Sequence, residues 1–291
     1  PEVAMRLSNY ILERQLPDGG WPLYAVDGNA NISASVKAYF ALKLLGHDKQ
    51  APHMVKARQM ILSLGGAEKS NVFTRITLAL FGQVPWHTPP AMPIEIMLLP
   101  KWFFFHLNKV AYWSRTVIVP LLMLYATKPV CRLGHTEVIA ELFKTDPDLL
   151  GHLDGFKHRA WRKNAFIVLD RLLKRALPLV PKRIKARALN EAERWTRERM
   201  QGDGGIGAIY PAMANAVMAL KSLGYGDHDP DYLRGIEAVD NLMIHCELKT
   251  VNQPSDGASF YSAAWGNSSA APAIQYQAKT GSAENSEKSF C

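Results

Sequence analysis

The chain has 291 residues, of which 48% are hydrophobic and 21% are charged, and its formal net charge is +8. This composition excludes an intrinsically disordered protein, and the length allows one large domain or two of ordinary size. The sequence contains neither an apolar run of the roughly 18 residues that a membrane-spanning helix needs nor an N-terminal export signal.

The cysteine pattern argues against disulfides and zinc. Cys131, Cys246 and Cys291 lie far apart without CxxC spacing. We therefore expect free thiols in a reducing compartment. The chain starts at Pro1 and enters a helical pattern within a few residues, so we expect it to be part of a longer protein.

The first element in chain order is one half of an internal repeat. ERQLPDGGWPLY (13–24) returns as ERMQGDGGIGAIY (198–210), and ALKxLG words begin at residues 41 and 219. Lys56 and Arg234 keep the same offset of 178 as the ALKxLG words. Each copy predicts a helix, a Gly-rich turn, a second helix, a polar turn and a third helix, which is the pattern of helical-repeat proteins.

The helices are predicted from apolar periodicity. Residues 35–46 have apolar side chains at 36, 39, 40, 42, 44 and 45, and Gly46 follows where a helix C-cap is expected. Sustained strand-like alternation is missing from the sequence, so we predict an all-α fold, either a closed ring of helices or a solenoid.

A basic amphipathic helix is predicted between residues 161 and 177. Residues 157–199 hold fourteen Lys and Arg against four acidic residues. On a helical wheel one side is apolar, one side is polar, and Ile167 alone interrupts the polar side. The apolar side holds Phe166, Val168, Leu169, Leu172, Leu173, Ala176 and Leu177, and the polar side holds Asp170, Arg171, Lys174 and Arg175.

This pattern fits an interfacial membrane anchor, whose apolar face enters the acyl boundary while cations meet anionic headgroups. The alternative is a helix that packs its apolar face on the protein's own core. Nucleic-acid binding is disfavoured, because the segment offers only Trp161 and Phe166 for stacking and no binding motif.

Acidic residues cluster in GYGDHDPDY, with Asp227, His228, Asp229 and Asp231 between two repeat helices. We interpret this segment, and KTDPDLL (144–150), as solvated turns that cap helices. The sequence contains no pattern typical of a nucleophile triad, a phosphate-binding loop or a metal-ligand motif, so we expect no metal and no cofactor.

Several short segments of the sequence resemble the triterpene cyclases. Arg6, Tyr10, Ile11, Gln15, Gly19 and Trp21 match the family's QW motif. The segments 71–86, 89–100, 112–124 and 203–213 are similar, in that order, to stretches of squalene-hopene cyclases. The resemblance covers residues 1–246 and implies an α/α toroid, incomplete here, as an N-terminal domain.

The resemblance assigns a structural role to the QW motif. It implies that Trp21 stacks on the Gln15 amide while Gly19 and Gly20 let the backbone come close, and that the Trp21 N–H finds an acceptor. Met200 and Ile206 replace Gln and Trp in the second copy, so this stack cannot form there.

The resemblance also implies cavity-wall residues. Trp113 matches a wall aromatic, and Ile209, Tyr210 and Pro211 match a stretch beside the cavity end where the final cation is quenched; Tyr210 stands where some members have Gln. Arg75 lies in an otherwise apolar helix, and we expect it to form an ion pair or to bind a helix carbonyl.

The family's acid motif is not in this sequence. Squalene-hopene cyclases protonate a terminal alkene with the central aspartate of a DxDD motif, which these 291 residues lack. We therefore predict no catalytic residue in this chain and no activity by itself, while complete members convert squalene to hopene or hopanol. The alternatives are a cyclase of a shorter polyene and a non-catalytic helical-repeat module that binds lipid or a partner.

The resemblance further implies a monotopic protein on the cytoplasmic side of a bacterial inner membrane. The anchor residues would be Phe166, Leu169, Leu172, Leu173 and Leu177. The expected partners are the lipid surface and squalene, with a homodimer as one option and nucleic acid excluded. Residues 247–291 are rich in Ser, Ala, Gly and Asn and are predicted to be an aberrant, disordered tail.

Overall fold

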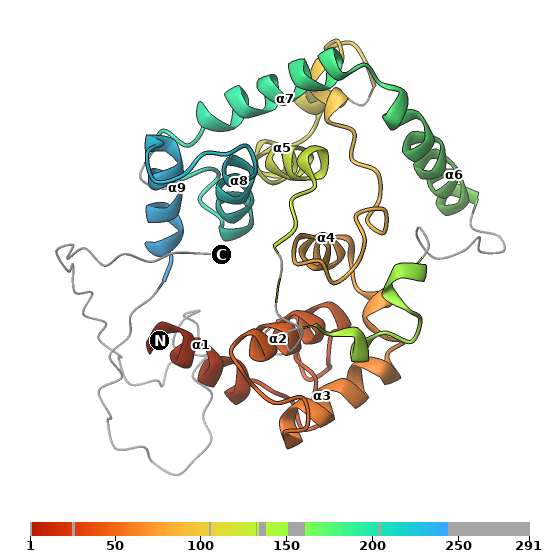
Figure 1. Ribbon diagram of the computed structural model, residues 1–291, viewed down its shortest axis with the longest axis vertical. Coiled ribbons are helices and arrows are strands. Elements are labelled where there is room, and N and C mark those ends of the chain that lie inside the picture. Colours follow the sequence, from red (N-terminus) through yellow and green to blue (C-terminus); the bar gives the residue numbers. More distant parts are fainter. Residues whose placement is uncertain are drawn as a thin grey trace, which may run out of the picture. The chain divides into compact units, whose positions relative to one another are not determined.

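The computed structural model describes residues 2–24, 27–104, 106–131, 133, 138–150, 161–202 and 205–243 (Figure 1). All regular elements in these ranges are helical, which confirms the all-α prediction. Residues Pro1–Val239 form one compact unit, and a second begins at Asp240. The predicted tail, residues 247–291, lies outside the described residues.

The α-helices alternate with short 3-10 helices. The α-helices are α1 (Glu2–Glu13), α2 (Ile32–Leu44), α3 (Pro52–Ser63), α4 (Val72–Leu80), α5 (Tyr112–Thr127), α6 (Trp161–Ala176), α7 (Lys182–Arg197), α8 (Tyr210–Ser222) and α9 (Pro230–Asp240). The 3-10 helices are η1 (Ala67–Lys69), η2 (Ile94–Leu98), η3 (Leu107–Lys109), η5 (Ala140–Leu142), η6 (Pro147–Leu149) and η7 (Leu177–Leu179).

Local sequence explains where these helices begin and end. The Asn31 side chain accepts hydrogen bonds from Ser33 N and Ala34 N at the start of α2, and Asn71 accepts one from Thr74 N at the start of α4. Gly46 follows α2 with a φ of +90°, as the sequence predicts.

Helices α2, α4, α5 and α8 form an inner layer that runs in one direction. Near their N-terminal ends, Asn71 N donates to Ser33 Oγ (2.8 Å); near the C-terminal ends, the Phe40 and Phe81 rings meet at 5.3 Å. Cys131 N donates to Leu80 O (2.8 Å), which joins the C-terminal ends of α4 and α5, and Figure 1 looks nearly along both helices.

Helices α5 and α8 are parallel as well. Thr116, near the start of α5, packs against Gly207, just before α8, and Thr127 Oγ1 lies 3.0 Å from Ser222 Oγ at the opposite ends. The four inner helices therefore present their N-terminal first turns at the same end.

An outer layer covers these helices. Helices α1 and α3 contact α2, and α7 contacts α5 through Ala188, Ala192 and Thr196, which are buried at a spacing of four residues. On α8, Lys221 Nζ lies 5.5 Å from the ring of Tyr232 in α9. Parallel inner helices with outer helices packed against them are the arrangement of an α/α toroid, so the described residues form part of that fold.

The QW motif joins α1 to the start of α2 and α3. Trp21 is buried, and its Nε1–H donates to Ile11 O (2.8 Å), which confirms that the indole finds an acceptor. Gln15 Nε2 donates to Gly19 O (2.8 Å) and His53 O (2.9 Å). The stacking of Trp21 on the Gln15 amide stays a prediction.

Of the two glycines in this turn, only Gly19 has a positive φ, +92°. A Cβ there would lie 2.6 Å from the backbone carbonyl carbon of Lys56. Gly20 matters through close approach alone, because its Cβ would lie 2.3 Å from the Cβ of Ala30. In the second copy Met200 and Ile206 are buried in an apolar cluster, where hydrophobic contacts replace the Gln and Trp hydrogen bonds.

Polar contacts between side chains connect α1 to the turn after α2 and to α3. Ser8 is the buried residue of α1, and its Oγ lies 2.7 Å from His47 Nε2, while His47 Nδ1 lies 3.0 Å from His53 Nε2. Burial first, and the neighbouring His47 second, lower the pKa of His53 below 6.5.

We expect the free energy of unfolding to fall as the pH drops below 6.5. Between the lowered pKa and 6.5 the unfolded chain binds more protons at His53 than the folded chain does, so stability rises with pH in that window. Urea unfolding at several pH values, for the chain and for His53→Gln, measures this effect. The variant should show a smaller drop, and an equal drop in both proteins would contradict the assignment.

Candidate functional site

Large apolar side chains lie exposed in the first turns of the inner helices α4, α5 and α8. They are Val72, Phe73, Tyr112, Trp113, Ile209 and Tyr210, here called the first-turn group. Because the inner helices are parallel, all six lie at the same end. Exposed aromatic residues in the first turns of three helices are unusual for a surface that meets water alone.

The structure brings together the predicted wall residues. Thr116 Oγ1 donates to Trp113 O (2.7 Å), and a Cβ on Gly207 would lie 2.6 Å from this same Oγ1. The first turn of α5 is thus fixed against the turn that leads into Ile209, Tyr210 and Pro211, all of which are exposed.

Sequence reasoning missed three members of the first-turn group: Val72, Phe73 and Tyr112. Their signal was their place at a helix start: Val72 and Tyr112 are the first residues of α4 and α5, as Tyr210 is of α8, and Phe73 is the second residue of α4, as Trp113 is of α5. Without the helix directions, however, nothing indicated that these starts meet at one end.

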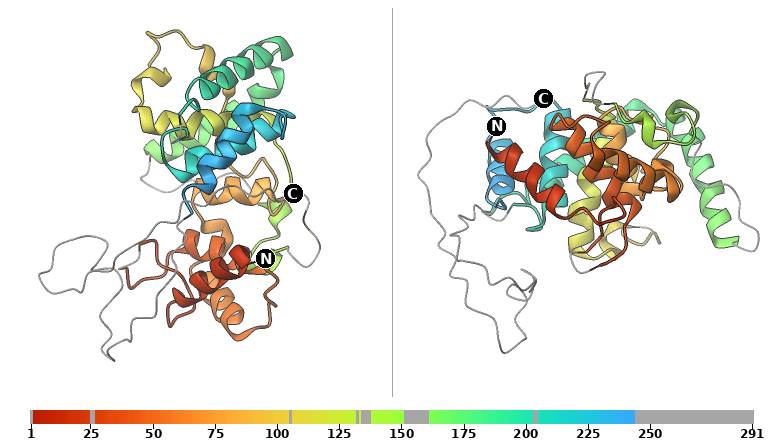
Figure 2. Two further views of the ribbon diagram at one scale, coloured as in Figure 1. Left: turned by 90° about the vertical axis from the view of Figure 1, so that its left-hand side faces the viewer. Right: turned by 90° about the horizontal axis from the view of Figure 1, so that it is seen from below.

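Helix α6 carries its apolar side outward. Phe166, Val168, Leu169 and Leu172 are 43–64% exposed and are called the α6 apolar arc below. Leu173 is half-buried. Leu177, the fifth predicted anchor residue, packs against the core from η7 and does not belong to the arc. Figures 1 and 2 show α6 at the edge of the described helices, outside the inner layer.

The face of α6 that contacts the protein is the one that the helical wheel assigned to solvent. Ile167 and Asp170 are buried, and Lys174 is largely buried. Asp170 Oδ1 accepts a hydrogen bond from Ala91 N (2.5 Å), and Lys174 Nζ donates to His87 O (2.9 Å). The alternative in which α6 buries its apolar side on the protein's own core is therefore wrong for the described residues.

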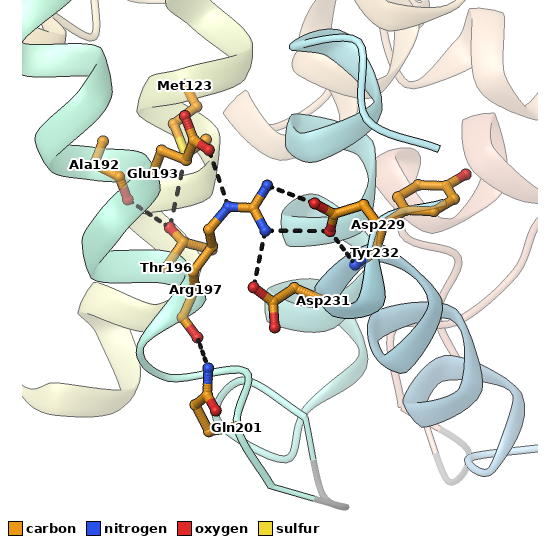
Figure 3. Close-up of polar contacts among 9 residues, drawn as sticks. All are labelled: Met123, Ala192, Glu193, Thr196, Arg197, Gln201, Asp229, Asp231 and Tyr232. Atoms are coloured by element: carbon orange, nitrogen blue, oxygen red, sulfur yellow. Dashed lines mark hydrogen bonds and ion pairs between the residues drawn. The ribbon is translucent and has the colours of Figure 1, made fainter. Parts of the chain in front are cut away.

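The basic segment divides into two halves. In α7, Arg194 pairs with Glu191 and Glu198. Arg197 pairs with Glu193, Asp229 and Asp231 (Figure 3). Internal carboxylates thus neutralise the C-terminal end of this segment. For Lys182, Arg183, Lys185 and Arg187, ion pairs are absent within the part of the chain that the structure describes.

The acidic turn before α9 has a structural role. Asp229 Oδ1 accepts a hydrogen bond from Tyr232 N (2.9 Å), which confirms the predicted helix cap. Both Asp229 and Asp231 also bind Arg197, so they are not solvated as predicted, and their side chains are only 16% and 15% exposed. Likewise, Asp146 caps η6, and Arg75 binds the carbonyl of Glu68, as expected for a structural residue.

These contacts shift the pKa values of Arg197 and Asp229 in opposite directions. Burial lowers the pKa of Arg197, but hydrogen bonds to Asp229, Asp231 and Glu193 outweigh it and raise the pKa above its ordinary value. The hydrogen bond from Arg197 lowers the pKa of Asp229 below 3.8. Both shifts favour the charged forms of Arg197 and Asp229, as expected for a structural ion pair.

Further features of the described residues concern metal sites, membrane-spanning helices and pockets. Clusters of three or more His, Cys, Asp or Glu that could hold a metal are absent from them, and none of their helices is long and apolar enough to cross a membrane. A pocket of about 180 Å³ lies between η2, η3, α5 and α7, lined by residues such as Ile96, Arg115 and Trp195, and it contains no predicted wall residue.

Comparison with known proteins gives the family. The model of the squalene-hopene cyclase N-terminal domain matches residues 1–248. The squalene-hopene cyclase of Zymomonas mobilis is 45% identical over 243 residues, which cover 84% of this chain and 36% of that protein.

Two further relatives carry the same name. The squalene-hopene cyclase of Bradyrhizobium diazoefficiens is 44% identical over 254 residues, which cover 87% of this chain and 38% of that protein. The squalene-hopene cyclase of Alicyclobacillus acidocaldarius is 35% identical over 237 residues, which cover 81% of this chain and 36% of that protein. The chain spans a little over a third of the length of the curated relatives it matches. Together with the helical arrangement, these matches show that the chain belongs to the squalene-hopene cyclase family and corresponds to its N-terminal region.

Proposed function

We propose that this chain supplies the membrane-docking helix and part of the cavity wall of a cyclase that acts on squalene. The observation that carries the proposal is the α6 apolar arc, which the protein's own contacts hold away from its core. Support for squalene comes from the names of the relatives, which are 35–45% identical to this chain over the aligned residues.

An apolar arc beside cations has the chemistry of an interfacial helix. Phe166, Leu169 and Leu172 would enter the acyl boundary, while Arg171 and Arg175 on the same helix would meet anionic headgroups. Each cation near an anionic surface contributes about 1 kcal/mol. In this proposal the protein would lie on one leaflet of a membrane, in which its apolar substrate would be dissolved.

The first-turn group would form a wall that stabilises positive charge. A cyclisation that begins with protonation of an alkene moves a carbocation along the substrate, and aromatic faces attract a cation by roughly 0.5–2 kcal/mol each. Trp113, Tyr112 and Tyr210 offer such faces from two neighbouring helices. Because the sequence contains no DxDD motif, the proton donor would come from residues beyond this chain.

Vesicle co-sedimentation tests the membrane role. The whole chain should bind vesicles containing anionic lipid, and Phe166→Ser and Leu172→Ser combined should reduce the bound fraction at least about tenfold, since each buried apolar side chain contributes about 1.5–3 kcal/mol. The matched control is Met5→Ser and Leu7→Ser in α1, which removes two equally exposed apolar residues from another helix. Equal binding by both variants would refute the proposal.

A further inference from the structure

Helix α6 buries an ion pair on the side opposite to its apolar arc. Lys174 Nζ lies 2.9 Å from Asp170 Oδ2 one helical turn away, and the two side chains are only 11% and 7% exposed. Removing two charges from water is costly unless other polar groups bind them, so a pair buried in this way needs further partners.

Those partners belong to the segment 86–91, which precedes η2. Ala91 N donates to Asp170 Oδ1 (2.5 Å), and Lys174 Nζ donates to His87 O (2.9 Å). Two further contacts hold the same segment. Trp86 Nε1 donates to the carbonyl oxygen of Pro129 (3.1 Å), two residues after the end of α5, and His87 Nε2 lies 3.1 Å from Leu150 O. Asp170 and Lys174 therefore bind a backbone that is already fixed to the core.

Two contacts at different positions along α6 also fix its rotation about its axis. At 100° per residue, Asp170, Lys174 and Ile167 fall within about 60° of one another, and Val168, Leu172 and Leu169 occupy the other side, while Phe166 lies at the edge of the arc, about 40° from Asp170. Left to the hydrophobic effect, such a helix would turn its leucines toward the core. The buried charges prevent this, because they could not stay in contact with their backbone partners after the rotation.

We propose that Asp170 and Lys174 are positioning residues that fix the rotation of α6 and so determine which side of it meets lipid. This inference rests on the proposed membrane function. In this proposal, the ion pair on the opposite side of α6 keeps the apolar arc exposed. Breaking the pair should therefore leave the arc without a defined orientation.

The contact itself can be tested without lipid, by hydrogen exchange at the Ala91 amide in the whole chain. Asp170→Ala should accelerate exchange at Ala91 by about tenfold or more, because the acceptor is lost, whereas Asp170→Asn keeps an oxygen acceptor and should exchange more slowly than Asp170→Ala. Equal exchange rates in the unmodified chain and in Asp170→Ala would overturn the proposal.

The orientation is tested with an environment-sensitive fluorophore on single cysteines, after the native cysteines are replaced by Ser. With vesicles containing anionic lipid, a label at Leu169→Cys should respond strongly, and a label at Arg171→Cys, about 160° away around the helix, should respond weakly. Asp170→Ala should reduce this difference by at least about half. The matched control is Glu141→Ala, which breaks the buried Lys43–Glu141 pair between α2 and η5 and should leave the difference unchanged.

The outcomes separate the two proposals. If a label at residue 169 in an otherwise unmodified α6 does not respond to vesicles, the membrane function is refuted, and the exchange rates at Ala91 still decide whether the contact exists. A difference between residues 169 and 171 that survives Asp170→Ala, or that Glu141→Ala reduces equally, would refute the positioning role.

Discussion

Arg197→Met should lower the free energy of unfolding by about 2–4 kcal/mol, because the substitution leaves Glu193, Asp229 and Asp231 largely buried without their shared cation. Arg197 is 20% exposed, so the expected loss lies toward the lower part of the range for buried pairs. The variant also removes the guanidinium that lies 4.2 Å from the Tyr225 ring centroid. Thermal or urea unfolding of both proteins at neutral pH measures the difference.

The neighbouring Arg194→Met is the matched control. Arg194 also contacts two carboxylates, Glu191 and Glu198, but its side chain is 60% exposed, so water and salt screen these pairs. Its substitution should lower the free energy of unfolding much less than that of Arg197. If the two variants lost equal stability, burial of the Arg197 network would not be what holds α7 to the turn before α9.

Gly19→Ala should destabilise the protein by about 3 kcal/mol. An alanine at a φ of +92° is strained by about 1–2 kcal/mol, and its Cβ would overlap the Lys56 backbone, which can move only if the QW turn shifts. The shift would also strain the hydrogen bonds from Gln15 to Gly19 and His53. A lower midpoint of thermal unfolding is the expected result.

Gly46→Ala separates strain from close approach. Gly46 has nearly the same φ, +90°, but a Cβ there would meet nothing within 4 Å. Its substitution should therefore cost only the conformational strain of about 1–2 kcal/mol. Equal losses for both variants would mean that the contact between Gly19 and Lys56 contributes nothing to stability.

Periodicity and the repeat were sufficient to predict α2, α6 and the helices of the repeat. Gly46 ends α2, Asn31 and Asn71 cap α2 and α4, Pro52 is the first residue of α3, and the repeat placed the helical hairpins correctly. These features are local, so a single stretch of sequence determines them. The packing direction of the helices is not local, and the first-turn group could be recognised only after contacts such as Thr116 with Gly207 had fixed the α5–α8 pair as parallel.

Helix α6 shows a different limit of sequence reasoning. The wheel correctly predicted an apolar side, but it assigned Asp170 and Lys174 to water because charged side chains are seldom buried. Their burial depends on Ala91 and His87, about 80 residues earlier in the chain, and no local pattern contains that information. The same holds for the pairing of Arg197 with Asp229 and Asp231.

The most direct test of the account is a chimera in which residues 1–243 of this chain replace the matching region of the Zymomonas mobilis squalene-hopene cyclase. Incubated with squalene, the folded chimera should form cyclic triterpene products, and Trp113→Ala in the chimera should reduce their yield, because an aromatic wall face is lost. A chimera that folds and binds vesicles but yields no cyclic product would contradict the proposal that this chain forms the wall of a squalene cyclase.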